Sequence, residues 1–332
     1  MRIGIIGIGA MGTLMAAHLH EFAEVIVIGN WPAQLAALGA DGLTLHHPDG
    51  RVTRRPIRAT NRLEAIGQVD LALILVKSHQ TDRAAAQARQ LLPPPGLALT
   101  LQNGLGNLEK VVQAVGEERA ALGVTAQGAT LLKPGHTLHA GHGPTHLVRA
   151  TRQRGGISVA DVAVLFNRAG LETHLVNRGD SLLWGKLAIN AGINPLTALL
   201  RVPNGFLAEN EEARRLMSAA AQETAAVAKA QGIALPYPDA ARRAWEVAQA
   251  TAANHSSMLQ DVLRGRPTEI DVICGEIVAH GRRLGITTPI NEKLLQLIHS
   301  LERDQELPVS DNIPIEQRLA ALVNILSPGG TI

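Results

Sequence analysis

The sequence has a single cysteine, few aromatic residues, almost no net charge and no long apolar run. The one cysteine, Cys274, excludes a disulfide framework within the chain and fits a reducing compartment. Aromatic residues make up only 2% of the 332 residues, so the core must consist of Leu, Ile, Val and Ala, and no platform for stacking nucleic-acid bases is present. The 31 basic and 29 acidic residues leave a net charge of +2, which argues against a surface that binds nucleic acid.

Apolar segments in this chain are short. None approaches the roughly 20 residues that cross a membrane, and the first residues already have the pattern of a strand instead of that of a secretion signal. We therefore expect a cytoplasmic protein with no membrane and no nucleic-acid partner. Its 332 residues are enough for two domains, each with a core of its own.

The start of the chain has the pattern of a dinucleotide-binding βαβ unit. Residues 2–6 form a short apolar run, a G-x-G-x-x-G motif follows, residues 13–22 have helical spacing, and residues 24–28 supply a second strand. The glycines permit a tight turn and a close approach to pyrophosphate, and the start of the helix offers N–H groups to the phosphates. The predicted nucleotide site consists of Gly7, Ile8, Gly9, Ala10, Met11 and Gly12.

The residue that follows the second strand bears on the choice of coenzyme. An Asp or Glu there would bind the ribose 2′-hydroxyl of NAD and repel the 2′-phosphate of NADP. This chain has Asn30, with no acid and also no Arg or Lys beside it. Asn30 can donate to a phosphate oxygen, although less strongly than a charged group. The pattern therefore favours NADP(H) without requiring it.

The rest of the N-terminal half continues as strands and helices. We expect an inserted hairpin at residues 43–46 and 52–57, a helix at 157–169, and strands at 69–76, 97–101, 120–125, 137–141 and 171–176. Because the carboxyl ends of parallel strands face the ligand crevice, Lys77 and Asn103, which follow two of these strands, are candidates for contact with coenzyme or substrate. Alternatively, Lys77 is a surface lysine and Asn103 belongs to a simple Asn-Gly turn.

Three histidines lie close together near the end of this half. His139, His142 and His146 fall in what reads as one glycine-rich hairpin, with residues 128–130 ahead of it and no nearby acid or cysteine. Metal sites usually combine histidine with such ligands. We therefore expect no metal ion there.

Beyond about residue 178 the apolar spacing is helical throughout. Helices are expected at residues 210–230, from 237, and at 256–261, 268–284 and 289–301. This gives an α/β Rossmann-type dinucleotide-binding domain, residues 1–177, followed by an all-α C-terminal domain, residues 178–332, for substrate and catalysis. The Ala-rich helix at 210–230 could pack in the core or against a second subunit, so a homodimer stays open.

A polar stripe interrupts the apolar run at residues 182–198. Lys186, Asn190 and Asn194 are four residues apart and would line one side of a helix. Such groups need hydrogen-bond partners, at about 1 to 3 kcal/mol for each one left unsatisfied. Either another helix or a polar substrate could supply those partners. Pro195 disfavours helical geometry at Asn194, which should therefore end one helix or cap the next.

Other polar residues of this half have both a structural and a functional interpretation. Ser257 with Gln260 fits a capping box, and Asn254 lies three residues before Ser257. Thr268 and Asp271 fit a second box, with Glu269 in the first turn of the helix that follows. Asn204 precedes a glycine, so its role could be simply to form a turn.

Taken together, these motifs resemble the ketopantoate reductase family, the NADPH-dependent 2-dehydropantoate 2-reductases of pantothenate and coenzyme A biosynthesis. The ordered set is specific, whereas each motif alone is common. The matching residues are 7–12, 76–80, 102–104, 128–129, 139–143, 184–187, 190, 194–198, 203–205, 256–261 and 268–271. The chain departs from the family in having Asn30, where an arginine for the 2′-phosphate is frequent.

The resemblance implies a role for each matched residue. Lys186 would be the proton donor, and Asn190, Asn194 and Asn204 would help to bind substrate. Asn254 and Ser257 would lie near the substrate carboxylate. The residues expected at the nicotinamide end, or bridging it to substrate, are Lys77, Asn103, Ala129 and Glu269.

The implied reaction is hydride transfer from the nicotinamide to a small 2-oxo acid. Negative charge that develops on the ketone oxygen must be met by a donor, and a lysine ammonium can serve and then give up its proton. The alternatives are a reductase of the same fold that acts on another 2-oxo acid or an imine, a non-catalytic NADP-binding sensor, and a scaffold protein with a relic nucleotide fold. The intact glycine motif argues against the last.

Overall fold

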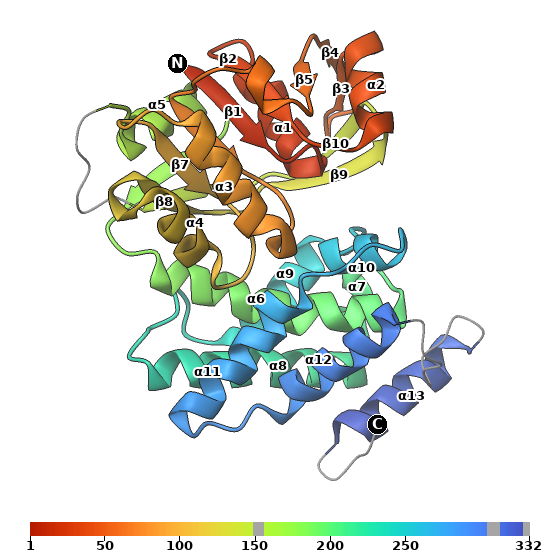
Figure 1. Ribbon diagram of the computed structural model, residues 1–332. Coiled ribbons are helices and arrows are strands. Elements are labelled where there is room, and N and C mark those ends of the chain that lie inside the picture. The colour runs from red at the N-terminus through yellow and green to blue at the C-terminus, as the bar shows by residue number, and fades with distance from the viewer. Residues whose placement is uncertain (149–155, 304–312, 328–332) are drawn as a thin grey trace. The chain divides into compact units, whose positions relative to one another are not determined.

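The computed structural model describes residues 1–148, 156–303 and 313–327. The chain divides into two compact units (Figure 1). The first consists of Met1–Gln102 with Gly106–Gly179, and the second of Asn103–Leu105 with Asp180–Ile332. Each unit is described by itself below.

The first unit is built on an eight-stranded sheet with the strand order β12-β11-β8-β7-β6-β1-β2-β5. All neighbouring strands are parallel except β11 and β8. The carboxyl ends of β5, β2, β1, β6, β7 and β8 therefore share one edge. The bounds are β1 (Arg2–Ile6), β2 (Glu24–Ile28), β5 (Arg58–Thr60), β6 (Leu71–Ile74), β7 (Leu97–Thr100), β8 (Ala120–Thr125), β11 (Thr145–Val148) and β12 (Thr173–Val176).

Helices cover both faces of this sheet because its central strands are apolar on both sides. Ile5 of β1 is buried in one cluster with Leu14 of α1, whereas the next residue, Ile6, is buried in another with Ala84 of α3. This is the doubly wound arrangement predicted from the sequence. The helices of the unit are α1 (Ala10–Leu19), α2 (Pro32–Asp41), α3 (Thr81–Leu91), α4 (Asn107–Val115) and α5 (Val159–Arg168), with the short turns η1 (Leu63–Ala65), η2 (Ser78–Gln80) and η3 (Glu117–Arg119).

A smaller four-stranded sheet, in the order β4-β3-β10-β9, completes the first unit. The predicted hairpin is confirmed as β3 (Leu43–His46) and β4 (Val52–Arg55), which pair antiparallel. Residues 128–130 were expected to lie between two strands, but they begin the strand β9 (Gly128–Lys133), which pairs with β10 (His136–Gly141). The single hairpin expected for His139 and His146 is wrong: His139 lies on β10, and His146 lies on β11 of the larger sheet.

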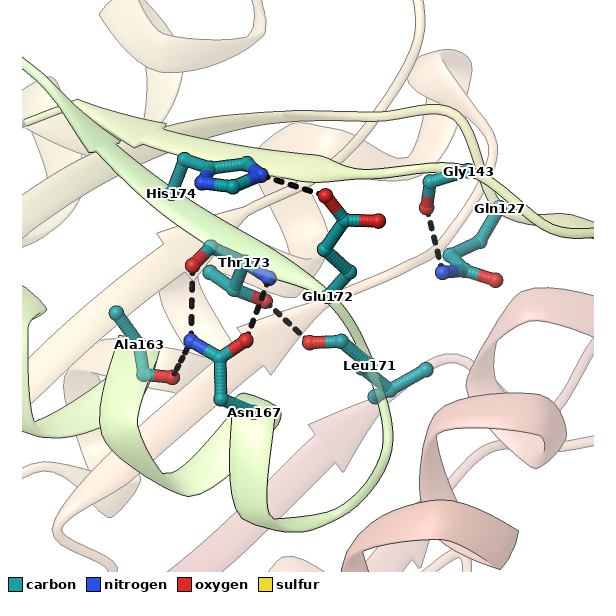
Figure 2. A network of polar contacts seen from close by, with 8 residues as sticks. All are labelled: Gln127, Gly143, Ala163, Asn167, Leu171, Glu172, Thr173 and His174. Atoms are coloured by element: carbon teal, nitrogen blue, oxygen red, sulfur yellow. Dashed lines mark hydrogen bonds and ion pairs between the residues drawn. The ribbon is translucent and has the colours of Figure 1, made fainter.

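The last strand of the first unit is held by one amide side chain (Figure 2). Asn167 of α5 donates to the carbonyls of Ala163 and Thr173, over 2.9 and 2.8 Å, and its Oδ1 accepts the N–H of Thr173 over 2.9 Å. The Thr173 hydroxyl donates to the carbonyl of Leu171 over 2.7 Å. Both backbone groups of Thr173 are thereby satisfied where β12 begins, before the chain leaves the sheet.

The second unit is helical, and no strand occurs in it within residues 180–303 and 313–327. Its core lies around α6 and α8, whose close approach needs Gly192, since a Cβ there would lie 2.9 Å from the carbonyl oxygen of Met217. None of the helices described is long and apolar enough to cross a membrane. The elements are α6 (Asp180–Leu200), α7 (Asn204–Glu209), α8 (Glu211–Ala230), α9 (Ala240–Ala250), α10 (Ser257–Val262), η4 (Asp271–Gly275), α11 (Glu276–Leu284), α12 (Pro289–Glu302) and α13 (Ile315–Leu326).

The helix break expected at Asn194 does not occur. Helix α6 runs through Pro195 without interruption. A proline inside a helix costs about 3 kcal/mol, but every residue from Ala191 to Leu200 is buried, and burial of one large apolar side chain contributes roughly 1.5 to 3 kcal/mol. Packing of Leu196, Leu199 and Leu200 therefore outweighs the local preference, and Asn194 lies inside the helix.

The two capping boxes predicted for the second unit are also wrong in detail. The N-cap of α10 is Ser256, whose Oγ accepts the N–H of Leu259, and Ser257 is the first residue of the helix. The Thr268 hydroxyl accepts the N–H of Ile270 over 3.2 Å. The helical segment that follows begins with the π-helical turn η4 at Asp271, so Glu269 precedes it instead of lying in its first turn.

Candidate active site

The glycine-rich turn lies between β1 and α1. Gly7 has a φ of +135°, and a Cβ there would lie 2.6 Å from the carbonyl of Leu75, so only glycine fits. A Cβ at Gly12 would lie 1.8 Å from the carbonyl oxygen of Gly7, so this glycine lets the helix approach the turn. A Cβ at Gly9, in contrast, would meet no atom within 4 Å.

Gly9 is the N-cap of α1, and no side chain caps this helix. The first N–H groups of a helix have no partner within it, and the helix dipole favours a negative charge in front of them. The open space at Gly9 is therefore bounded by groups that suit a pyrophosphate. The residues predicted for the nucleotide thus fit this group, with Gly9, Ala10 and Met11 partly accessible and Gly7, Ile8 and Gly12 buried.

Asn30 and Lys77 follow the two strands that flank β1. The N–H of Gly7 donates to the carbonyl of Ile28 at the end of β2 over 2.9 Å, and the N–H of Leu75 donates to the last carbonyl of β1 over 2.8 Å. Both segments therefore leave the sheet beside the glycine turn. Asn30 is exposed and Lys77 is partly buried.

Ala129 lies near the start of β9, in the smaller sheet. It is partly buried and pairs with His139 of β10. The hydroxyls of Thr13 in α1 and Thr137 in β10 share a hydrogen bond of 2.7 Å. This bond joins the helix that follows the glycine turn to the sheet that carries Ala129.

The polar stripe of the second unit lies on α6, as predicted. Lys186 and Asn190 are partly buried, and Asn194 is 6% exposed. Burial lowers the pKa of Lys186 to about 8, and the negative charge of Glu269 opposes this shift. The ammonium is thus charged at neutral pH but holds its proton less tightly than a surface lysine.

Glu269 and Asn103 lie together in the same unit. Glu269 is 6% exposed, and the amide of Asn103 approaches its Oε2 to 3.5 Å, the limit of a hydrogen bond. The next residues anchor Asn103, because the N–H of Leu105 donates to the carbonyl of Val272 in η4 over 3.0 Å. The structure therefore brings Asn103 to Glu269, and Glu269 into the electrostatic environment of Lys186.

Asn204 and Asn254 are joined through their backbones. The N–H of Asn204 donates to the carbonyl of Asn254 over 2.9 Å, and the Asn204 amide donates to the Thr251 hydroxyl over 2.9 Å. Asn204 is the first residue of α7, not part of an isolated turn. Its Oδ1 is buried, and within the described residues no donor reaches it. A buried acceptor of this kind suits a donor on a ligand.

Several residues that position this set were missed by sequence reasoning. The hydroxyls of Thr197 and Ser256 share a hydrogen bond of 2.7 Å, which links α6 to the segment that begins with Ser257. The Tyr237 hydroxyl donates to the carbonyl of Gly185, beside Lys186, over 2.6 Å. Only Ser256 had a signal, since it precedes the predicted helix and could have been chosen as the cap.

His139 lies among other histidine rings of the first unit. The ring of His139 lies 3.7 Å from that of His142 and 5.2 Å from that of His18, centroid to centroid. Burial lowers the pKa of His139 to about 4. Over the parts of the chain that the structure describes, no three His, Cys, Asp or Glu side chains are grouped so that they could hold a metal ion.

The first unit has a doubly wound, mostly parallel sheet with a glycine-rich turn after its first strand, and the second is helical with a half-buried lysine. Together these features define the class of Rossmann-type dinucleotide-binding oxidoreductases. Comparison with known proteins gives the family. The ketopantoate reductase PanE/ApbA model matches residues 3–151, and the ketopantoate reductase PanE/ApbA C-terminal model matches residues 180–302. The chain belongs to the ketopantoate reductase family, as the sequence motifs predicted.

Individual relatives cover nearly the whole chain. The 2-dehydropantoate 2-reductase of Halobacterium salinarum is 36% identical over 308 residues, which are 92% of this chain and 100% of that protein. The 2-dehydropantoate 2-reductase of Vibrio cholerae is 33% identical over 91% of this chain and 98% of its own length. The similarity thus extends through both units.

Solved structures agree with this assignment. The PanE/ApbA family ketopantoate reductase from Ralstonia eutropha superposes with a TM-score of 0.83 and is 31% identical, over 92% of this chain and 99% of that one. A ternary structure of D-mandelate dehydrogenase with NADH and anilino(oxo)acetate has a TM-score of 0.82 at 26% identity, over 91% and 99% of the two chains. The fold is therefore shared with a dehydrogenase that binds NADH.

Proposed function

We propose that this protein catalyses the NADPH-dependent reduction of 2-dehydropantoate to pantoate, a step of pantothenate and coenzyme A biosynthesis. Family membership and the names of the relatives support the reaction. The single observation that carries the chemistry is the half-buried Lys186, whose pKa of about 8 is set by burial against the charge of Glu269.

The first unit would hold the coenzyme. The pyrophosphate would bind to backbone N–H groups of the glycine turn, which consists of Gly7, Ile8, Gly9, Ala10, Met11 and Gly12. Asn30 would lie beside the adenosine ribose. Lys77 and Ala129 would contact the nicotinamide half, with Asn103 and Glu269 as further contacts. When bound, the reduced nicotinamide supplies the hydride.

Lys186 would act as the proton donor. As the ketone carbon is reduced, negative charge grows on its oxygen, and an ammonium placed near that oxygen stabilises the charge. Lys186 then gives up a proton to form the 2-hydroxyl group, and its lowered pKa makes this transfer easier than from a surface lysine. Glu269 keeps the ammonium charged before the reaction.

The amide side chains would orient the substrate. Asn190 and Asn194 lie one and two turns beyond Lys186 on α6, so they can bind the substrate beside its reacting carbonyl. Asn204 offers the buried acceptor Oδ1 to a substrate hydroxyl. Asn254 and Ser257 would bind the carboxylate, and Asn103 would bridge substrate and coenzyme.

A second candidate is the reduction of another 2-oxo acid. The structural neighbour that binds NADH is a D-mandelate dehydrogenase, whose ternary structure contains an oxo acid, anilino(oxo)acetate. Lysine-assisted hydride transfer would be the same for such a substrate. Only the groups around the substituent on C2 would differ.

The experiment is a coenzyme oxidation assay with 2-dehydropantoate, run beside NADH and beside 2-oxo acids of different size. The expected result is rapid turnover of 2-dehydropantoate with NADPH, and loss of most of kcat in Lys186→Ala while the coenzyme still binds. Turnover of a different oxo acid alone would replace the substrate but keep the chemistry. Binding of NADPH without turnover of any acid would favour a sensor, and near-normal kcat in Lys186→Ala would remove Lys186 from the mechanism.

Location and assembly belong to the same proposal. We propose a cytoplasmic location, and a homodimer through the Ala-rich α8 is the assembly to test. Light scattering on the purified protein measures its mass directly. A mass near the 35.2 kDa of one chain would exclude the dimer.

A further inference from the structure

The end of β2 has no positive charge for a 2′-phosphate. Residues 29–34 contain neither Arg nor Lys, and Asn30 is the only polar residue directly after the strand. A phosphate monoester carries about 1.5 to 2 negative charges at neutral pH, and sites that bind NADP usually place an arginine near it. An arginine or lysine from another segment of the chain could supply the missing positive charge.

The neighbouring strand β5 brings such a cation to this position. Strands β2 and β5 are parallel, with Ile28 beside Thr60 at their carboxyl ends. The pairing continues one step further, because the N–H of Gly29 donates to the carbonyl of Thr60 over 3.1 Å. Asn30 and Arg62 each lie two residues beyond the Ile28–Thr60 pair. Adjacent strands are about 4.8 Å apart, well within the length of an arginine side chain.

The Arg62 guanidinium is available for a ligand. Arg62 is exposed, and among the residues that the structure describes no ion pair or hydrogen bond engages its guanidinium. Its backbone is fixed, because its N–H donates to the Thr60 hydroxyl over 3.1 Å. The other arginine of this strand, Arg58, is engaged: it donates to the carbonyl of Ala65 over 2.7 Å and lies 3.9 Å from Glu24.

The local charge also favours an anion at this place. Neither residues 29–34 nor residues 58–63 contain an acid, so no carboxylate competes with a phosphate directly after either strand. The next acid along the chain is Glu64, which is exposed.

We infer that Arg62, from the strand next to β2, supplies the cation for the 2′-phosphate of NADPH and sets the preference for NADPH over NADH. The inference rests on the proposed function, because it deepens the coenzyme use proposed there. Asn30 then contributes a neutral hydrogen bond, and Arg62 contributes the charge.

Equilibrium binding tests this inference without any substrate. Dissociation constants for NADPH, NADH and the fragment 2′,5′-ADP are measured by calorimetry for the wild type, Arg62→Gln, Arg62→Lys and a control, Arg51→Gln. Arg51 is also exposed, and it pairs with Asp49 in the loop between β3 and β4. The control therefore makes the same change in net charge elsewhere on the unit. Circular dichroism checks that each variant is folded.

Arg62→Gln should weaken the binding of NADPH and 2′,5′-ADP by about tenfold or more, since a charge-assisted hydrogen bond is lost. NADH binding should not change, Arg51→Gln should change neither, and Arg62→Lys should recover part of the NADPH affinity. Equal effects on NADPH and NADH, or no effect on either, would overturn the inference, as would a wild type that does not distinguish the two coenzymes. If binding behaves as expected but 2-dehydropantoate is not reduced, the proposed function fails and the role of Arg62 stands.

Discussion

The hydroxyls of Thr197 and Ser256 share a hydrogen bond of 2.7 Å between two helices of the second unit. Thr197 is in the last turns of α6, the helix that carries Lys186, and Ser256 caps α10 by accepting the N–H of Leu259. Both residues are buried. This one bond therefore fixes the first residue of α10, Ser257, relative to the polar face of α6.

Thr197→Val should loosen this connection. The variant keeps the shape of the side chain but removes its hydroxyl, at an expected cost of about 1 to 2 kcal/mol in the free energy of unfolding. We expect KM for the 2-oxo acid to rise more than kcat falls, because Ser257 binds the substrate carboxylate in the proposed mechanism. Urea unfolding and steady-state kinetics measure both effects. Thr224→Val is the matched control, since the Thr224 hydroxyl bonds only the carbonyl of Ala220 in its own helix; an equal rise in KM there would contradict the prediction.

The rate of reduction should fall as pH rises through about 8. In the proposed mechanism Lys186 gives a proton, so only its charged form would be active, and burial lowers its pKa to about 8. Glu269 raises this pKa, so Glu269→Gln should move the alkaline limb of the pH–rate profile to lower pH. The profile of kcat over pH 6 to 10 measures the shift. An alkaline limb at the same pH in both proteins would show that Glu269 does not act on Lys186.

Alanine substitutions at two glycines of the nucleotide turn should have different effects, one on folding and the other on coenzyme binding. Gly7→Ala should unfold or strongly destabilise the protein, because its φ is +135° and the new Cβ would overlap the carbonyl of Leu75. Gly9→Ala should leave thermal stability nearly unchanged, since its Cβ meets no atom within 4 Å. The methyl group would instead occupy the space of the pyrophosphate and weaken NADPH binding by about tenfold or more. Normal coenzyme affinity in Gly9→Ala would place the phosphates elsewhere.

Acid should destabilise the first unit through His139. Its Nε2 bonds Gln127 over 2.7 Å, its Nδ1 is buried with no partner in the described part of the chain, and its neighbours His18, His142 and His47 all disfavour a further charge. The folded pKa of about 4 lies below the 6.5 of an unperturbed histidine. The unfolded chain therefore binds more protons below pH 6.5, and stability is lost as pH falls toward 4.

This difference in pKa between the folded and unfolded chain lowers the free energy of unfolding by roughly 3 kcal/mol once the pH has fallen to 4. Urea unfolding at a series of pH values measures the loss. His139→Gln, which keeps a donor for Gln127 but does not titrate, should show a shallower dependence between pH 6.5 and 4. The same slope in the variant and the wild type would assign the acid sensitivity to other groups.

Local patterns in the sequence predicted most of the fold. The glycine turn, the buried strands and the long helix at residues 211–230 each depend on residues that are neighbours along the chain, so their signals survive without tertiary information. Helix α6 shows the limit of this reasoning. Pro195 carries a local signal for a break, but complete burial of the surrounding turns keeps the helix intact.

The sequence predicted which helix carries the polar stripe, but not the contacts between distant segments. The spacing of Lys186, Asn190 and Asn194 places them on one helix face, and the structure has them there. The backbone bond between Asn204 and Asn254 joins segments that are 50 residues apart, and no local pattern marks such a pair. Arg62 is similar, because only the pairing of β5 with β2 brings the end of β5, which Arg62 follows, beside the end of β2.

Asn103, Gly104 and Leu105 follow β7 of the first unit, yet they belong to the second, where Leu105 is 7% exposed in the helical core. The polypeptide thus passes between the units three times, after residues 102, 105 and 179. Neither unit is a continuous piece of chain, so a gene fragment that starts at residue 180 would encode a helical unit with part of its core missing. During synthesis on the ribosome, these three residues emerge long before Val272, the partner of Leu105, so the second unit cannot be completed until the C-terminal helices have been made.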